Sequence, residues 1–477
     1  MAQAPTFLWH DYETWGTDPA MDRPAQFAAI RTDSELNPVG EPVMWFARPA
    51  MDMLPQPDAC LVTGITPQRA WQEGLPEAEF IGRIRQEMMK PGTCSVGYNN
   101  IRFDDEFTRN TLYRNFYDPY EREWKNGNSR WDLIDVVRLC GALRPEGIHW
   151  PVTEDGWPSY RLEALTAAND IEQEGAHDAL VDVTATIALA RLIKQTHPKL
   201  FSYALSMRNK KTVAETLAVG TMKPVFHVSG MFGSRYHCAS VVLPLCMHPV
   251  NKNAVIAIDL RYSPQAVLSL GVEEIRQRLY TPASELDEND RIHFKNIHIN
   301  KCPMVAPIKM VTPEVENRIN LDMNKIRQHY EMAAASSVIS IKAGEVFATH
   351  EFMEKIDPDA MLYSGGFFSD ADKFVMSQVV SSKPEELDAQ RFVFNDPRLK
   401  EMFFRYKARN FPDSLTMDES EQWECYRFQR LTNPEYGATI TLESYQARLE
   451  ALYALHENDE KRATVLSALM EWGDALL

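Results

Sequence analysis

The chain has 477 residues, which is too long for one ordinary hydrophobic core and predicts roughly three domains. Hydrophobic residues make up 44% of the sequence, the mean hydropathy is -0.35, and no run approaches the roughly 20 apolar residues of a membrane helix. The N-terminus also lacks a signal-peptide pattern, so we expect a cytoplasmic protein. The net charge of -17 at first disfavours a nucleic-acid partner, although an acidic protein can still carry a basic groove.

The seven cysteines are scattered and are never spaced as CxxC. Their odd number and their spacing argue against both a disulfide framework and a zinc knuckle. We expect most of them to be small buried side chains.

Apolar and aromatic runs near the N-terminus predict an antiparallel opening of three strands, at residues 6–12, 26–31 and 43–47. A helical spacing of apolar residues follows at 76–89, and Pro91 and Gly92 stop it before another strand at 93–98. Further helices are expected from near Asp104 onward and at 132–143, 161–168 and 176–194. Strands followed by alternating helices indicate an α/β domain, to which we assign residues 1–196.

The rest of the sequence changes character twice. Short strand-like runs separated by Gly, Pro and Asn predict a mainly β domain with some helix over residues 197–351, with strands at 225–228, 240–245, 254–260 and 293–299. From residue 352 onward the pattern is mostly helical, with 392–394 standing out as strand-like. We therefore predict a helical C-terminal domain at 352–477.

Asp11 and Glu13 are the first candidate functional residues. Side chains at i and i+2 of a strand point to the same face, so these two acids would present hard oxygen ligands side by side. Such a pair suits magnesium or manganese. Taken alone, an acid-x-acid pattern on a strand is more often a solvated face.

Three later residues complete a possible two-metal site. A phosphodiester is cleaved readily when two divalent ions about 4 Å apart assist the attack, and holding them takes several carboxylates. Asp104 at a helix start and Asp182 in the last long helix of the domain would add two more. His177 precedes Asp182 by five residues, about 140° around a helix, so a place at the helix entrance would let its imidazole accept a proton from the attacking water.

In this order and spacing, Asp11-x-Glu13, Asn100-x-x-Phe103-Asp104 and His177-x4-Asp182 resemble the three motifs of the histidine-type DEDD exonuclease superfamily, over residues 5–195. The resemblance implies a ribonuclease-H-like α/β fold and removal of nucleotides from 3′ ends with two magnesium ions, for which manganese can substitute. It implies that Asp11, Glu13, Asp104 and Asp182 are metal ligands and that His177 is the general base. All five are present, so nothing in the motifs suggests an inactive enzyme.

Runs in all three predicted domains are similar to one family of this superfamily, the bacterial exonuclease I family; they lie at residues 95–100, 228–233, 299–303, 365–372 and 408–412. The resemblance implies an exonuclease domain followed by an SH3-like domain and an α-helical C-terminal domain. It further implies processive 3′-to-5′ degradation of single-stranded DNA to 5′-mononucleotides, in DNA repair and recombination. The implied protein partner is the acidic, Phe-ending tail of single-strand-binding protein, and we expect a monomer without membrane association.

Single-stranded DNA is held by basic side chains along its backbone and by rings on which its bases stack. Residues 109–144 interleave both kinds, although acids are about as numerous there and aromatic side chains also pack in cores. Arg161 resembles a family position that contacts substrate, and two lysines lie in basic stretches of the second domain. The predicted substrate contacts are Glu13, Arg109, Tyr120, Trp124, Arg138, Arg144, Tyr160, Arg161, Lys210 and Lys301.

Three alternatives stay open at this point. An RNA-trimming exonuclease of the same superfamily would use the same five residues, although the additional domains favour DNA. A non-catalytic nucleic-acid-binding scaffold is disfavoured by the intact motifs. A phosphatase or nucleotidase using the same metals would leave the basic second domain unexplained.

Overall fold

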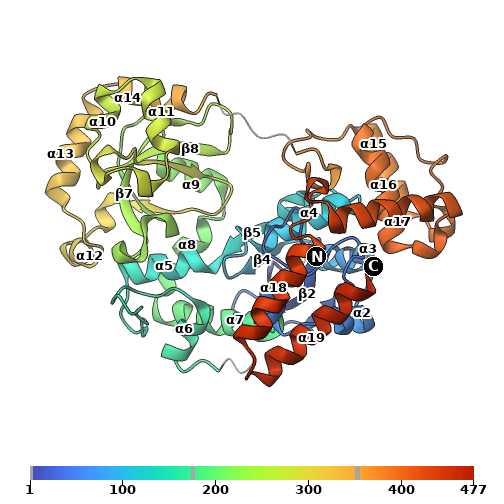
Figure 1. Ribbon diagram of the computed structural model, residues 1–477. Coiled ribbons are helices and arrows are strands. Elements are labelled where there is room, and N and C mark those ends of the chain that lie inside the picture. Colours follow the sequence, from blue (N-terminus) through green and yellow to red (C-terminus); the bar gives the residue numbers. More distant parts are fainter. Residues whose placement is uncertain (1–3, 173–177, 350–354, 477) are drawn as a thin grey trace. The chain divides into compact units, whose positions relative to one another are not determined.

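The computed structural model of the chain describes residues 4–172, 178–349 and 355–476 (Figure 1). By their contacts, these residues form two compact units. The first unit contains residues 4–129, 178–184 and 355–476, and the second contains residues 130–172 and 185–349. Contacts therefore group the N-terminal and C-terminal parts of the chain together, and the three domain ranges that follow chain order remain predictions.

A five-stranded mixed sheet with the order β3-β2-β1-β4-β5 organises the N-terminal region. The central strand β1 is antiparallel to β2 along most of its length, but it pairs in parallel with β4 only from Thr6 to Trp9. The strands predicted at 6–12, 26–31, 43–47 and 93–98 are confirmed, whereas the short β5 was not predicted. The strands are β1 (Thr6–Thr14), β2 (Pro24–Thr32), β3 (Val43–Phe46), β4 (Thr93–Gly97) and β5 (Ser129–Asp132).

Helices from both ends of the chain pack into the first unit. The apolar face of α3, with Phe80 and Ile84, covers the sheet beside Leu8 and Phe27. The last two helices, α18 and α19, pack against α1 and α2 through a separate apolar cluster. The helices are α1 (Pro57–Thr63), α2 (Pro67–Glu73), α3 (Glu77–Met88), α4 (Asp104–Arg114), α15 (Asp370–Ser381), α16 (Pro397–Asn410), α17 (Met417–Thr432), α18 (Leu442–Leu455) and α19 (Glu460–Ala475), and α7 (Ala179–Thr196) begins in this unit.

A buried ion-pair network joins α16 and α17 to the N-terminal region within the same unit. Arg409 contacts the carboxylates of Asp52 at 2.6 Å and Asp359 at 2.7 Å, and Arg430 contacts Asp357 at 2.8 Å. Because all these side chains are mostly buried, each charge relies on its partner rather than on water. The network explains why residues more than 300 positions apart share one compact unit.

The second unit is built on an antiparallel sheet with the order β10-β6-β7-β8-β9. The strands predicted at 225–228, 240–245, 254–260 and 293–299 are confirmed, and the four-residue β10 was not predicted. The strands are β6 (Val225–Val228), β7 (Ala239–Met247), β8 (Ala254–Asp259), β9 (Phe294–His298) and β10 (Met304–Pro307). The helices are α5 (Leu133–Leu143), α6 (Leu162–Ala168), α8 (Pro198–Ser206), α9 (Lys210–Leu217), α10 (Gln265–Ser269), α11 (Val272–Tyr280), α12 (Pro313–Arg318), α13 (Met323–Ala334) and α14 (Val338–Val346).

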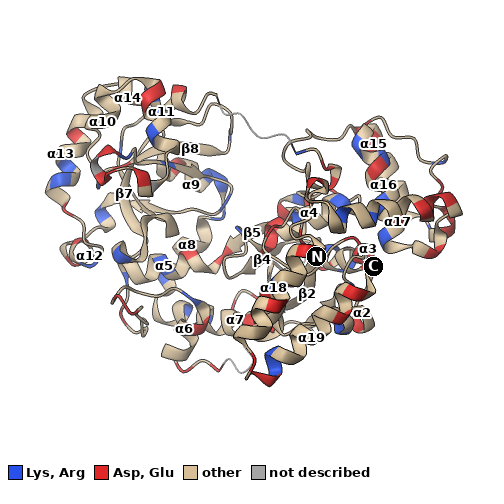
Figure 2. Ribbon diagram, in the orientation of Figure 1, with Lys and Arg blue, Asp and Glu red and all other residues tan. Residues whose placement is uncertain are grey.

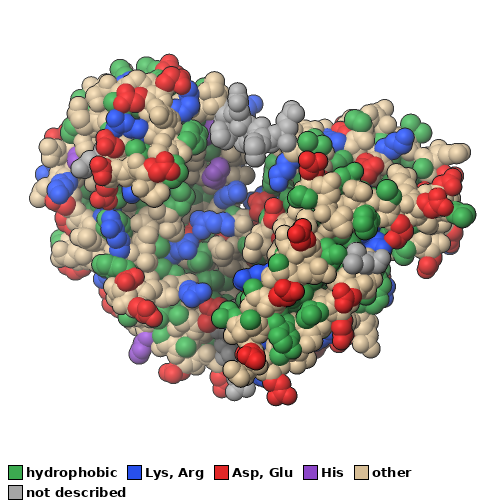
Figure 3. Space-filling view, viewed as in Figure 1, with side chains coloured by type: hydrophobic (Ala, Val, Ile, Leu, Met, Phe, Trp, Pro, Cys, Tyr) green, Lys and Arg blue, Asp and Glu red, His purple; other side chains and the backbone are tan. Residues whose placement is uncertain are grey.

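Charged residues are unevenly spread along the chain. Acidic residues gather on α17, whose first turn contains Asp418 and Glu419 (Figure 2). On the face shown in Figure 3, acidic side chains of the C-terminal helices alternate with hydrophobic ones. Within the described ranges, we find no helix that combines the length and the hydrophobicity required of a bilayer span.

Candidate functional site

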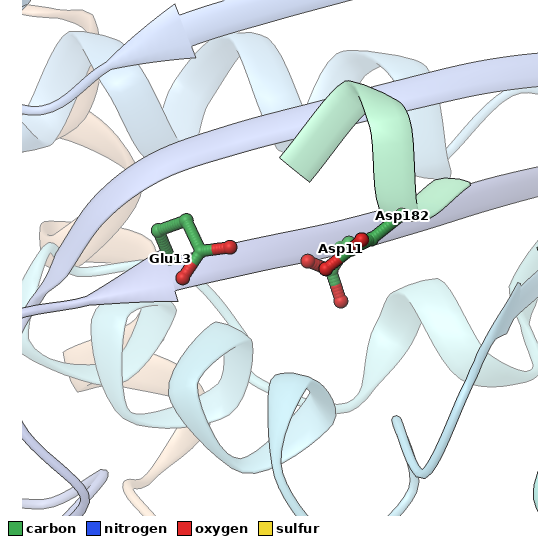
Figure 4. Close-up of side chains that lie close together, drawn as sticks. All are labelled: Asp11, Glu13 and Asp182. Atoms are coloured by element: carbon green, nitrogen blue, oxygen red, sulfur yellow. The ribbon is translucent and has the colours of Figure 1, made fainter. Parts of the chain in front are cut away.

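Three carboxylates from two elements meet at one place in the first unit. Asp11 and Glu13 lie two residues apart on β1, and Asp182 lies in the first turn of α7. Each offers an oxygen, and these three oxygens lie within 4.8 Å of one another. Figure 4 shows Asp182 directed from α7 towards Asp11, with Glu13 farther along the strand. The predicted same-face arrangement of Asp11 and Glu13 is thus confirmed; we call these three residues the acid cluster.

Asp104 is held beside this cluster by the backbone of β1. It is the first residue of α4, and its carboxylate accepts a hydrogen bond of 3.0 Å from the N–H of Tyr12, the residue between Asp11 and Glu13. The pairing of β1 with β4 ends at Trp9, so the N–H of Tyr12 is bound by the Asp104 side chain and not by a backbone carbonyl of β4. Asp104 therefore lies close enough to raise the pKa of both Asp11 and Glu13.

The charges of the acid cluster oppose one another. Burial raises the pKa of Asp11 well above its usual value, and the carboxylates of Asp104, Glu13 and Asp182 raise it further. Burial, followed by Asp182, Asp104 and Asp178, raises the pKa of Glu13 to about 8. Four acids in this arrangement cannot all be ionised unless a cation or protons neutralise them. Their hard oxygen donors and their number suit divalent ions such as magnesium or manganese.

His177, the predicted general base, lies outside the described residues. Described structure resumes at Asp178, whose side chain accepts a hydrogen bond of 3.0 Å from the N–H of Leu180 as α7 begins. Its backbone carbonyl accepts from the N–H of Asp182 at 3.1 Å. The helix predicted at 176–194 is therefore confirmed from Ala179 onward, while the role of His177 stays a prediction.

Three residues that support the site were not singled out from the sequence. The side-chain oxygen of Gln26, paired with Glu13 across β1 and β2, accepts from the N–H of Ala179 at 3.3 Å and so holds the start of α7. The hydroxyl of Thr108 on α4 donates to the phenol oxygen of Tyr12 at 3.0 Å, which ties α4 to β1. Asp178 adds a further negative charge near Glu13. Of these three residues, only Asp178 could have been noticed in the sequence, because it directly follows His177.

Besides Glu13, three predicted substrate contacts belong to the first unit. The guanidinium of Arg109 is buried and donates to Glu123 at 2.7 and 2.9 Å and to Glu106 at 2.9 Å. It also lies 5.4 Å from the ring centre of Tyr120. Tyr120 and Trp124 line a cavity of about 660 Å³ together with Phe367, and Trp124 is 65% exposed. The two rings are thus accessible, whereas Arg109 is held by two glutamates.

The other predicted contacts lie in the second unit, apart from Glu13. Arg138 pairs with Asp135 at 2.7 Å, and Arg144 donates to the carbonyl of Leu143 at 2.6 Å. Exposed Arg161 stands just before α6. Tyr160 is buried and packs against Trp150, Lys210 donates to the Asn253 side chain at 2.6 Å, and Lys301 is half-buried in the turn after β9. Contact of any of these with a substrate stays a prediction.

Family models and curated relatives match the sequence over almost its whole length. A model described as Exonuclease matches residues 8–190, the Exonuclease I SH3-like domain matches 208–349, and the Exonuclease I C-terminal domain matches 356–476. Exodeoxyribonuclease I of Escherichia coli (strain K12) is 46% identical over 476 residues, which cover 100% of this chain and 99% of that protein.

Solved structures agree over the whole chain. E. coli Exonuclease I in complex with a dA16 oligonucleotide has a TM-score of 0.96 at 46% identity, covering 99% of this chain and 100% of that one. A zinc-bound E. coli ExoI–ssDNA complex has a TM-score of 0.94 at 46% identity, covering 99% of each chain. The predicted fold class, an α/β exonuclease domain with an SH3-like domain and a helical C-terminal domain, is confirmed. The chain belongs to the exonuclease I family.

Proposed function

We propose that the chain is a processive 3′-to-5′ exonuclease that hydrolyses single-stranded DNA to 5′-mononucleotides with two divalent ions. The observation that carries this proposal is the acid cluster, three carboxylates within 4.8 Å in a region that matches an exonuclease family model. The names of the relatives support the substrate, because one is an exodeoxyribonuclease and two solved relatives are complexes with DNA strands.

In this proposal Asp11, Glu13, Asp104 and Asp182 hold the ions, which are Mg²⁺ in the cell and replaceable by Mn²⁺. When bound, the ions supply positive charge to the attacking and leaving oxygens of the phosphodiester. The burial and mutual repulsion of the carboxylates support this assignment, since the raised pKa values mark groups that lack neutralising charge. Tyr12 fixes Asp104 through its backbone N–H, and Gln26 fixes the helix that carries Asp182.

His177 is proposed as the general base that takes the proton of the attacking water. An imidazole with a reference pKa of about 6.5 suits this role near neutral pH. In the sequence His177 stands two residues before Ala179, where α7, the helix that carries Asp182, begins. Glu13 is proposed to touch the terminal nucleotide as well as an ion.

The remaining parts of the proposal concern the setting of the reaction. We propose domains at residues 1–196, 197–351 and 352–477, supported by family matches at 8–190, 208–349 and 356–476. We further propose a cytoplasmic monomer that acts in DNA repair and recombination and binds the tail of single-strand-binding protein. Light scattering would test the monomer, and fluorescence anisotropy with a labelled tail peptide would test the partner.

The most direct test is a time course of products from matched single-stranded DNA, double-stranded DNA and single-stranded RNA, each labelled at the 3′ or the 5′ end. We expect Mg²⁺-dependent release of labelled mononucleotide from the 3′ end of single-stranded DNA, with little action on the other two. Chelation with EDTA and the substitution Asp11→Ala should each abolish release.

Three outcomes would contradict parts of this proposal. Activity that survives Asp11→Ala would exclude the metal assignment. Preference for RNA would favour the RNA-trimming alternative, because discrimination depends on how the site meets the 2′-hydroxyl. Binding without hydrolysis in the unaltered chain would favour a scaffold.

A further inference from the structure

A buried ion pair connects the start of α4 to the segment that carries two predicted base-stacking rings. The Arg122 guanidinium contacts the Asp105 carboxylate at 2.6 Å, and the side chains are 1% and 0% exposed. Asp105 follows Asp104 in the first turn of α4, and Arg122 lies in the short 3-10 helix η1 (Glu121–Glu123). The pair thus bridges 17 positions of sequence, between a predicted metal ligand and a predicted DNA-binding segment.

On the side of the acid cluster, the pair lies close enough to β1 for the charges of Asp105 and Arg122 to act on His10, which is buried on this strand. Two residues further along β1, the N–H of Tyr12 donates a hydrogen bond to Asp104. A movement of Asp105 would therefore move the first turn of α4 and with it the Asp104 carboxylate.

On the other side, the pair fixes the segment between Tyr120 and Trp124. Arg122 lies between these two residues, and neighbouring Glu123 holds Arg109 of α4 at 2.7 Å. The Arg109 guanidinium in turn lies over the Tyr120 ring. Two buried ion pairs thus attach the ring-bearing segment to α4, and Arg122–Asp105 is the one next to Asp104.

We propose that the Arg122–Asp105 pair is a positioning element that holds the rings of Tyr120 and Trp124 in register with the Asp104 carboxylate, so that bases stacked on them align the strand with the acid cluster. The inference rests on the proposed function and specifies how its substrate is positioned. Geometry is the better account of the pair than stability, because a buried ion pair is often no more stabilising than apolar residues of similar volume. Among the described residues, the Nε and Nη1 atoms of Arg122 have no hydrogen-bond partner, which is a poor arrangement for stability alone.

The test compares Arg122→Met with Arg122→Lys, which keeps the charge, and with Lys407→Met as a matched control. Lys407 forms a comparable pair with Glu419 at 2.7 Å, with side chains 5% and 22% exposed, between α16 and α17. Steady-state kinetics on single-stranded DNA should give Arg122→Met a KM about tenfold higher, the size expected from losing one stacked base, with a smaller change in kcat. Arg122→Lys should recover most of this loss, and Lys407→Met should keep the original KM.

Melting temperatures of all variants are measured, and kinetics are run well below the lowest. If Arg122→Met melts earlier but keeps the KM of the unaltered chain, the positioning role is wrong and the pair is structural. Should Arg122→Met fail to fold, the doubly substituted Arg122→Met/Asp105→Leu chain, which buries no lone charge, replaces it, and an unchanged KM there has the same meaning. A failure of the proposed function is distinguishable, because the unaltered chain itself would then not hydrolyse single-stranded DNA.

Discussion

Two groups of buried carboxylates in the first unit have opposite electrostatics. Burial by itself would raise the pKa of Asp52 and of Asp359, but Arg409 and further arginines outweigh it and hold both pKa values well below the usual range. Burial also raises the pKa of Asp11 and Glu13, and there the nearest charges are other acids, which raise it further. Buried carboxylates of one unit are thus compensated by arginines in one place, whereas in the other they face further acids.

This difference separates structural acids from acids that need a ligand. In the ion-pair network, arginines of the same chain neutralise the carboxylates, so these acids need no ion from solution once the chain has folded. The acid cluster is complete only when cations or protons arrive from solution, and a strongly perturbed pKa of this kind is typical of functional sites. Substitutions in the two groups should therefore affect different properties of the protein.

The largest expected effect is on catalysis. Asp182→Asn removes one donor of the acid cluster and should lower the rate of mononucleotide release by about a thousandfold or more, since metal assistance supplies several kcal/mol of transition-state stabilisation. The metal-free melting temperature should stay equal or rise, because one repelling charge is gone. Rates with Mg²⁺ and thermal melts in EDTA measure both. Near-normal activity, or a marked drop in melting temperature, would contradict the assignment.

The second effect is on stability. Asp359→Asn leaves Arg409 and Arg405 without their shared carboxylate and should lower the free energy of unfolding by about 3–5 kcal/mol. Urea denaturation of the full chain measures the loss. Glu79→Gln is the control, because the exposed Glu79–Arg83 pair should contribute less than about 1 kcal/mol. A loss no greater than that of the control would mean that the network is not structural.

Much of the fold could be predicted from the sequence because its strands and helices have clear apolar periods. β3 and β6 are as short as β5 and β10 but consist mainly of apolar residues, and they were predicted. β5 was missed because its sequence, Ser-Arg-Trp-Asp, contains one apolar residue, and β10 because it ends in a proline, which is unfavourable in a strand. Local sequence patterns also could not reveal that the N-terminal and C-terminal regions of the chain pack against each other. The bond between the Gln68 side chain and the Ala468 carbonyl, and the pair between Asp52 and Arg409, join residues hundreds of positions apart.

The candidate site was predictable to the extent that its residues share short motifs. The alternation of a strand placed Asp11 and Glu13 on one face, and the order of motifs added Asp104 and Asp182. The contacts that hold those acids were not predictable, because they join backbone N–H groups to distant side chains, as in Tyr12 with Asp104 and Ala179 with Gln26. No residue type or spacing marks such a bond in advance.

The third prediction concerns the alkaline side of the pH range. The folded pKa of Glu13, about 8, exceeds its ordinary value of 4.5, so the metal-free fold binds a proton that the unfolded chain releases. This contribution to stability is full below about pH 4.5 and is lost as pH rises through 8. The melting temperature in EDTA should therefore fall from pH 6 to pH 9, and the gain on adding Mg²⁺ should grow over the same interval.

Glu13→Gln isolates the contribution of this residue to the alkaline loss. It should flatten the metal-free profile between pH 6 and pH 9, whereas the exposed Glu79→Gln should leave it unchanged. A metal-free profile that is the same with and without the Glu13 carboxylate would show that the acid cluster is neutralised in some other way.

The smallest effect is expected on the acid side, where another buried group, Glu77 paired with Arg23 and Arg114, provides the opposite case. Burial would raise the pKa of Glu77, but Arg114 and Arg23 lower it to about 2, below its ordinary value of 4.5. Its contribution is present above about pH 4.5 and is lost as pH falls through 2; a shift of this size corresponds to roughly 3 kcal/mol. Urea denaturation between pH 3 and pH 6 should show that the free energy of unfolding decreases as the pH is lowered. The decrease should be smaller in Glu77→Gln than in the unaltered chain. Parallel profiles for the two proteins would contradict the pairing of Glu77 with both arginines, and addition of Mg²⁺ should not alter the difference, because it arises away from the acid cluster.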